Sequence, residues 1–195
     1  MKLAVITGAT RPGRQTTRQS QWIVNTASKI EGVTVEHVDL KDYPMPFFNE
    51  AISPRYNPNR EIEPTVQKWL DKINEFDAYV FVTPEYNHTI PGELKNVFDY
   101  MTWELKHKPA AVASHGTVGG ARAALTLKEV LSEGQAVVIP QFSAVHGISE
   151  LISEEGVLDA TAAANPYGPQ TQLNGMLTEL KWYSNALATA RATEA

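Results

Sequence analysis

Short apolar runs alternate along the chain with longer segments in which apolar residues recur at a helical period. Five runs are short and rich in β-branched residues, which predicts strands. These runs are residues 2–6, 33–39, 78–83, 110–114 and 136–139. Three of them are almost continuously apolar, a pattern typical of strands that are covered on both faces. The pattern therefore predicts a sheet buried between two layers.

The segments between these runs carry apolar stripes at the spacing i, i+3, i+4, i+7, so each is predicted to be a helix with one face on the sheet. The stripes are Ile23, Ala27 and Ile30; Val66, Leu70 and Ile73; Leu94, Val97, Phe98 and Met101; Ala124, Leu127 and Leu131; and Met176, Leu180, Tyr183 and Leu187. Strict alternation of strands and helices, joined by right-handed crossovers, gives a parallel sheet with helices on both faces. The fold class predicted is α/β.

Two stretches have no clear period. Residues 40–63 contain four prolines, which exclude a regular helix or a central strand, and a loop of that length is usually functional or mobile. Residues 145–169 are rich in small residues and turn signals. We expect this second stretch to be a solvated connection over the surface.

Composition narrows the class of protein. The 195 residues are 43% hydrophobic and 20% charged, the balance of one globular domain spanning residues 1–195. There is no cysteine, the first apolar run is too short for a signal peptide, and no run reaches the roughly 18 residues of a membrane span. These features predict a cytoplasmic protein. The net charge of -5 argues against a nucleic-acid partner, and the five histidines lack ligand spacing, so we expect no metal site.

In an open parallel sheet, ligands bind beyond the carboxyl ends of the strands. The segment after the first strand, residues 7–17 (loop A), combines glycines, hydroxyl groups and arginines at the start of a helix. Helix N-termini and arginines both favour phosphate, so loop A is predicted to bind a phosphate group. It lacks the Gly-x-Gly-x-x-Gly and Gly-Lys-Ser/Thr patterns of dinucleotide and triphosphate sites. The residues expected to contribute are Thr10, Arg11, Arg14 and Thr16.

Two further loops follow the third and fourth strands. Residues 83–92 (loop B) carry prolines at both ends, and this stiffness suits a backbone that hydrogen-bonds the edge of a flat ring. Residues 114–122 (loop C) carry three glycines that let the main chain approach a planar ligand closely. The residues expected to line the ligand are Pro84, Glu85, Tyr86 and Asn87 in loop B and Ser114, His115 and Gly116 in loop C. Because backbone groups dominate, Gly116→Val is expected to impair binding and Glu85→Gln to be mild.

Together these motifs resemble the NAD(P)H-dependent FMN reductase family over residues 2–148. The most specific match is Thr-Pro-Glu-Tyr-Asn at 83–87, followed by Ile-Pro-Gly-Glu-Leu-Lys-Asn-Val-Phe-Asp at 90–99. Gly8-x-Thr-Arg-Pro-Gly-Arg and Ser114-x-Gly-x-x-Gly-Gly-x-Arg look like the family's other two loops. Ala9 departs from the family, which usually has serine there, so Thr10, Thr16 or Thr17 would have to supply that hydroxyl.

The resemblance implies a three-layer flavodoxin-like fold, a five-stranded parallel sheet of order 2-1-3-4-5, with FMN as cofactor and NADPH or NADH as co-substrate. The implied acceptor is a small molecule such as a quinone, an azo compound or a free flavin. The flavin performs the redox chemistry, so no side chain is expected to be catalytic. Family likeness also implies a homodimer or homotetramer, with Tyr100 or Trp103 buried between subunits.

Two alternatives remain open from the sequence. One is a one-electron carrier like flavodoxin, which would have no NAD(P)H turnover of its own. Such a carrier usually has a strongly acidic face, whereas the charge here is spread thinly along the chain. The other is a binding or regulatory module that keeps the fold without the cofactor. Colour in the purified protein separates this module from a flavoprotein.

Overall fold

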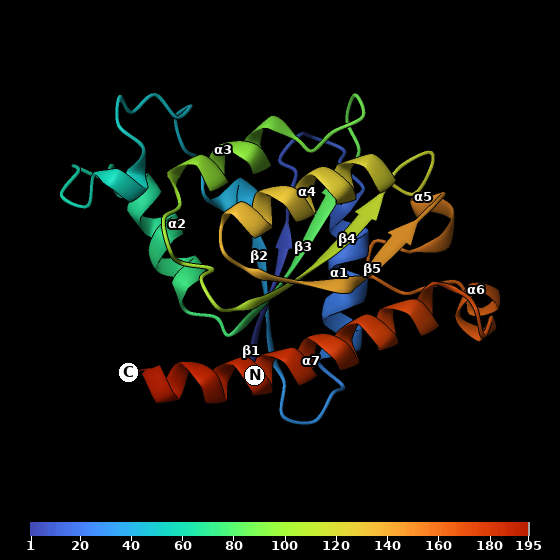
Figure 1. Ribbon diagram of the computed structural model, residues 1–195. Helices are drawn as coiled ribbons and strands as arrows, with labels where there is room; N and C mark the ends of the chain where they lie inside the picture. Colours follow the sequence, from blue (N-terminus) through green and yellow to red (C-terminus); the bar gives the residue numbers. More distant parts are fainter. Residues whose placement is uncertain (195) are drawn as a thin grey trace.

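A five-stranded parallel sheet forms the centre of the protein in a computed structural model that describes residues 1–194 (Figure 1). The order of the strands is β2-β1-β3-β4-β5, which confirms the flavodoxin-like arrangement. Their bounds are β1 (Lys2–Thr7), β2 (Thr34–Asp39), β3 (Ala78–Pro84), β4 (Pro109–His115) and β5 (Val137–Val145). β3 and β4 are buried along their whole length, as their apolar runs predicted.

Helices cover both faces of the sheet. Helices α1 (Thr16–Ala27) and α7 (Pro169–Glu194) pack on one face, and α2 (Pro64–Asn74), α3 (Gly92–Tyr100) and α4 (Ala121–Glu133) pack on the other (Figure 1). Alternate residues of β1 enter the two cores: Leu3 and Val5 face α1 and α7, whereas Ala4 and Ile6 face α2 and α3. This alternation explains why an unbroken apolar run is needed for a strand covered on both sides.

The edge strand β5 is longer than the sequence pattern predicted, since it continues through Pro140 to Val145. A register shift in its pairing with β4 falls between Ala110 and Val112, and the strand resumes beyond it. Proline is tolerated at such an irregularity on an edge strand, because no ladder hydrogen bond is lost. Pro140 is therefore the reason why the sequence pattern ended this strand too early.

The expectation of a solvated connection at residues 145–169 is wrong. This segment contains α5 (Ile148–Leu151) and α6 (Ala160–Ala164), and Ile148, Ile152 and Leu158 are buried in the core beside α1. Arg18 of α1 donates to the Ile152 carbonyl oxygen at 2.9 Å. The small residues and turn signals of this segment outweighed three separate apolar residues, which the tertiary structure buries.

The irregular segment at 40–63 contains only two short 3-10 turns, η1 (Leu40–Asp42) and η2 (Pro54–Tyr56), yet polar side chains hold it in place. The amide of Asn96 in α3 accepts from the Phe48 N–H and donates to the Pro46 carbonyl oxygen, both at 2.8 Å. The guanidinium of Arg60 is almost completely buried, where it pairs with Glu50. These contacts fix the segment against α3.

Within residues 1–194, no helix combines the length and apolarity needed to cross a membrane.

Candidate functional site

Loops A, B and C meet at the carboxyl ends of β1, β3 and β4, at the top of Figure 1. The parallel register pairs Thr83 with Ser114 and Pro84 with His115, so loops B and C leave the sheet side by side. The N–H of Gly8 donates to the Val82 carbonyl oxygen at 2.8 Å, which joins loop A to the same edge. The structure thus brings the three predicted loops together.

The two arginines of loop A have different roles. Arg14 is largely buried, forms an ion pair with Asp39 at the end of β2, and donates to the Thr10 carbonyl oxygen at 3.3 Å. Its Nε atom is buried and has no partner among residues 1–194. Arg14 is therefore mostly committed to holding loop A, with one donor left over.

Arg11 is exposed and links loop A to loop B. Its Nε donates to the hydroxyl of Tyr86 at 2.8 Å, and its guanidinium carbon lies 5.3 Å from the centre of the Tyr86 ring. Its two terminal amino groups form no hydrogen bond or ion pair with any residue from 1 to 194. Arg11 is thus a positioned cation with free donors, as an anion site requires.

The hydroxyls of loop A point to protein groups. Thr10 donates to a Glu93 carboxylate oxygen at 2.9 Å, and the buried Thr16 hydroxyl lies 2.9 Å from His115 Nε2. At the start of α1, Gln15 provides no side-chain cap, so the first N–H groups of that helix are left for a ligand. Thr16 therefore offers a ligand its backbone N–H, while its hydroxyl is engaged with His115 of loop C.

Loop B is a rigid two-residue hairpin. Tyr86 and Thr89 exchange two backbone hydrogen bonds of 3.0 Å, and the φ angles of Asn87 and His88 are 48° and 68°. Two consecutive positive φ angles in such a hairpin define a type I′ turn. The turn projects Asn87 outward and holds Tyr86 beside Arg11.

Glu85 joins loop B to loop C through its side chain. Its carboxylate accepts from the backbone N–H of Arg122 at 3.0 Å and from that residue's guanidinium at 2.9 Å, and only 9% of the side chain is exposed. The backbone N–H of Glu85 donates to the His115 carbonyl oxygen at 3.0 Å. The carboxylate caps α4, whose N-terminus has no other side-chain cap. Glu85→Gln is therefore expected to have more than the mild effect on ligand binding that the sequence predicts.

Loop C is closed by its own contacts. The Ser114 hydroxyl donates to the Gly119 carbonyl oxygen at 2.8 Å, and the N–H of Gly119 donates to the Gly116 carbonyl oxygen at 3.0 Å. Gly116 is half-buried, and a Cβ atom added there would lie 3.4 Å from Glu85 Cβ. Loops B and C therefore form one continuous backbone surface, suited to the edge and face of a planar ring.

His115 is buried where the three loops meet, and this position changes its titration. Burial and, to a smaller extent, the charge of Arg11 lower the pKa of His115 from 6.5 to about 4. Burial also lowers the pKa of His37, whose Nε2 lies 2.7 Å from the Thr7 hydroxyl below loop A. Both imidazoles are thus neutral parts of the scaffold at neutral pH.

The lowered pKa of His115 predicts that acid destabilises the flavin-free protein. Between the unfolded pKa of 6.5 and the folded value of about 4, the unfolded chain binds more protons, so stability is complete above 6.5 and is lost as the pH falls. From about pH 7.5 to about pH 5, His115 alone should cost about 2 kcal/mol of unfolding free energy. Urea unfolding at a series of pH values measures this loss. His115→Gln should reduce the slope and the exposed His88→Gln should not; equal slopes in all three proteins would contradict the assignment.

Three side chains that contact the loop residues were not among the site residues expected from the sequence, although Glu93 and Arg122 lie inside the motifs that resemble the family. They are Asp39, which pairs with Arg14; Glu93, which accepts from Thr10; and Arg122, which pairs with Glu85. Each stands directly at the end of a strand or the start of a helix that borders the site. That placement was the available signal, because strand ends and helix starts converge on one edge of a parallel sheet.

Comparison with known proteins agrees with this geometry. Residues 1–150 match the family model described as NADPH-dependent FMN reductase. The chain is 32% identical over 134 residues to an NAD(P)H-dependent FMN reductase, ntnL, of Nectria sp, covering 67% of each chain. It is 31% identical over 140 residues to an NAD(P)H:quinone oxidoreductase of Solanum tuberosum, covering 67% of this chain and 66% of that protein. The solved structure of FerB, a flavoenzyme NAD(P)H:(acceptor) oxidoreductase from Paracoccus denitrificans, superposes with a TM-score of 0.69 at 23% identity over 96% of this chain and 97% of that one.

Proposed function

The chain belongs to the NADPH-dependent FMN reductase family, and we propose that its loops A, B and C bind the FMN on which its activity depends. It is an FMN-dependent oxidoreductase that takes hydride from NAD(P)H and passes electrons to a small-molecule acceptor, such as a quinone or a flavin. We propose that residues 1–195 act as a single FMN-binding domain. The cytoplasmic location remains a prediction from composition, which cell fractionation would test.

The residues of the site fit FMN. A monophosphate needs a cation and several N–H donors, and loop A offers the free amino groups of Arg11, the unpartnered Nε of Arg14 and the uncapped start of α1. The buried and unsatisfied Nε is the most telling of these, because buried donors are almost always paired. This orphaned donor at an uncapped helix end is the observation that carries the proposal.

FMN, when bound, supplies the capacity to accept hydride and to pass electrons on. The protein's contribution is placement. Arg11 and the start of α1 would hold the phosphate, and the backbone of Pro84–Asn87 and of Ser114–Gly116 would line the ring. Tyr86 would pack near the ring, held by the hydrogen bond from Arg11. The neutral His115 keeps loops A and C in register through its contact with Thr16.

Reconstitution tests the proposal directly. The purified protein, freed of small molecules and titrated with FMN, should bind one equivalent and acquire the visible absorption of a bound flavin. FAD should bind more weakly, because loop A has one anion site and no pyrophosphate motif. No binding of FMN, or preferential binding of FAD, would contradict it.

We further propose that the enzyme is a homodimer or a homotetramer, but the residue expected at the interface must be corrected. Tyr100 is only 4% exposed, and its ring packs edge-on against Phe48 of the same chain, so it is not available to a partner. Trp103 is 48% exposed, and its ring centre lies 5.0 Å from the guanidinium carbon of Arg55 and 5.7 Å from Lys106 Nζ. Of the two aromatic residues, Trp103 remains the candidate.

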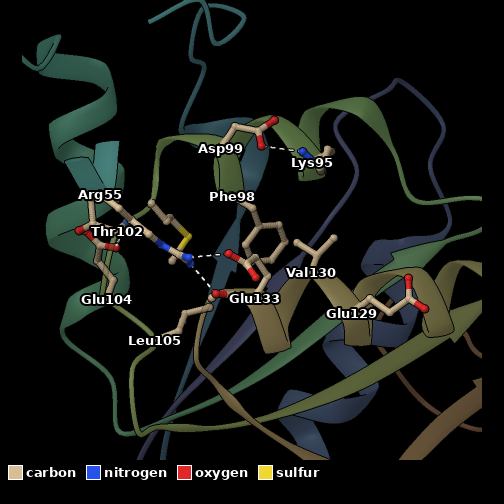
Figure 2. A pocket seen from close by; sticks show the side chains of 12 residues that line it. Arg55, Lys95, Phe98, Asp99, Thr102, Glu104, Leu105, Glu129, Val130 and Glu133 are labelled. Atoms are coloured by element: carbon tan, nitrogen blue, oxygen red, sulfur yellow. Dashed lines mark hydrogen bonds and ion pairs between the residues drawn. The ribbon is translucent and has the colours of Figure 1, made fainter. Parts of the chain in front are cut away.

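A cavity of about 270 Å³ beside Trp103 supports this proposal. It lies between α3 and α4, with Phe98 and Val130 on its walls and Arg55 reaching across to Glu133 (Figure 2). Leu125, on the exposed side of α4, is 65% exposed. Six charged side chains share the lining of the cavity with Phe98, Met101, Leu105 and Val130, and such mixed surfaces are ordinary in protein interfaces. We propose that a second copy of the chain covers this face.

Light scattering of the FMN-loaded protein at micromolar concentration should give at least twice the 21.5 kDa mass of one chain. Leu125→Arg should lower that mass, because it places a charge in the proposed interface, while flavin binding persists. A mass of one chain for the wild-type protein, with full flavin occupancy and activity, would rule out the oligomer.

A further inference from the structure

A cavity of about 290 Å³ lies next to loop A but outside the surface formed by loops B and C. Its walls come from Thr10 of loop A, from the start of α3, and from residues 40–47 of the irregular segment. Thr10 borders both this cavity and the proposed phosphate site, so a ligand that reaches the flavin could extend into it. The contacts described for loops A, B and C do not account for the residues that line this cavity.

The wall at residues 46–48 is rigid, yet it presents an aromatic ring to solvent. Asn96 binds the backbone on both sides of Phe47, through the Pro46 carbonyl oxygen and the Phe48 N–H. Phe48 packs against Tyr100, whereas the side chain of Phe47 is 81% exposed at the rim of the cavity. Because Phe47 lines the cavity and its ring is exposed, that ring is accessible to a ligand bound there.

Among the residues that the structure describes, the cavity wall carries one unpaired cation and one carboxylate. Lys41 lines the cavity, and its ammonium has no ion pair or hydrogen bond with any residue from 1 to 194. The one carboxylate on the wall, that of Glu93, accepts from the Thr10 hydroxyl. Lys68 does not line the cavity: its ammonium donates to the Asp42 carbonyl oxygen at 3.2 Å and lies 4.9 Å from the centre of the Tyr43 ring.

We propose that this cavity takes the adenosine half of the reduced pyridine nucleotide, with Lys41 binding one of its phosphate groups and Phe47 packing on the adenine. The inference rests on the proposed function, because it names a second subsite for the hydride donor. The cavity is too small for a whole dinucleotide, and it combines a free cation, an exposed ring and apolar walls, as a phosphorylated nucleoside requires. The acceptor would then need no contact with this cavity.

Calorimetry with adenosine 2′,5′-bisphosphate and with ADP tests the subsite without turnover. The FMN-loaded wild-type protein should bind at least one of them, and Lys41→Gln should weaken that binding about tenfold, as expected for one charged hydrogen bond. If Lys41→Gln weakens the binding of the bisphosphate alone, Lys41 contacts the 2′-phosphate. If it weakens the binding of both the bisphosphate and ADP, Lys41 contacts the pyrophosphate. Lys68→Gln is the matched control and should bind like wild type. Phe47→Ala should also weaken binding, whereas Tyr56→Ala, an exposed aromatic of the same segment outside the cavity lining, should not.

Steady-state kinetics give an independent readout. Lys41→Gln should raise the KM for the pyridine nucleotide about tenfold and leave kcat and the KM for the quinone unchanged. Absence of nucleotide binding, equal binding by wild type and Lys41→Gln, or a loss of FMN affinity in Lys41→Gln would overturn the inference. If the wild-type protein oxidises no NAD(P)H, the proposed function fails, whereas the calorimetry still decides whether the cavity binds nucleotides.

Discussion

Gly120→Ala is expected to lower the free energy of unfolding by about 3 kcal/mol and to weaken FMN binding at the same time. Gly120 has a φ angle of 74°, which costs an alanine about 1–2 kcal/mol. A Cβ atom there would also lie 2.7 Å from the His115 carbonyl oxygen and 2.9 Å from the His115 nitrogen. Backbone cannot move aside cheaply, so the clash adds about 1–3 kcal/mol and displaces the end of β4. Urea unfolding and an FMN titration measure the two effects.

Gly13→Ala is the matched control for this substitution. Gly13 lies in loop A with a φ angle of 70°, close to that of Gly120, but no atom lies within 4 Å of a Cβ added there. Its replacement should therefore cost only the conformational strain of about 1–2 kcal/mol. If the two variants lose equal stability, the close approach of loop C to β4 is not what requires glycine at position 120.

Arg11→Ala is expected to weaken FMN binding about 10- to 100-fold and to leave the stability of the flavin-free protein nearly unchanged. This range follows from about 1.5–3 kcal/mol for hydrogen bonds to a charged group. Arg11 is exposed and its amino groups are free, so its loss disturbs the ligand more than the fold. Fluorescence titration with FMN measures the affinity, and urea unfolding measures the stability.

Arg14→Ala should lower both the affinity for FMN and, unlike Arg11→Ala, the stability of the flavin-free protein. Its loss leaves Asp39 without its partner in a mostly buried ion pair, so the flavin-free protein should be destabilised measurably.

An Arg11→Ala variant that binds FMN like wild type would remove Arg11 from the phosphate site. A large loss of stability in that variant would show that its contact with Tyr86 is structural.

The fold could be predicted because its signals are local. Continuous apolar runs such as those of β3 and β4, separated by helical stripes, specify buried parallel strands whatever the details of packing. The errors of the secondary-structure prediction arise at single residues whose environment is set by tertiary contacts. Pro140 interrupts the pattern of β5, but the strand passes it at a register shift on the sheet edge. Ile148, Ile152 and Leu158 are core residues in a segment whose small residues and turn signals predicted exposure.

The sequence predicts where the candidate site lies, but not which contacts its side chains make. The three loops follow from the strand ends, and the structure brings them together. Which side chains are free for a ligand did not follow, because their partners are distant in the sequence. Thr16 is occupied by His115, 99 residues away, and Glu85 by Arg122, 37 residues away. Such pairs form only when the sheet places their loops side by side, and no local pattern reports them.

One anaerobic experiment tests the central claim, that this chain binds FMN between loops A, B and C and moves electrons from NAD(P)H to a small-molecule acceptor. The FMN-loaded protein is mixed with one equivalent of NADPH or, in a parallel sample, of NADH, and then with menadione, while the visible flavin absorption is followed. We expect NADPH to bleach the bound flavin and menadione to restore it. A flavin that NADPH and NADH both leave oxidised would indicate a one-electron carrier, a protein that holds no flavin would indicate a binding module, and either result would contradict the account.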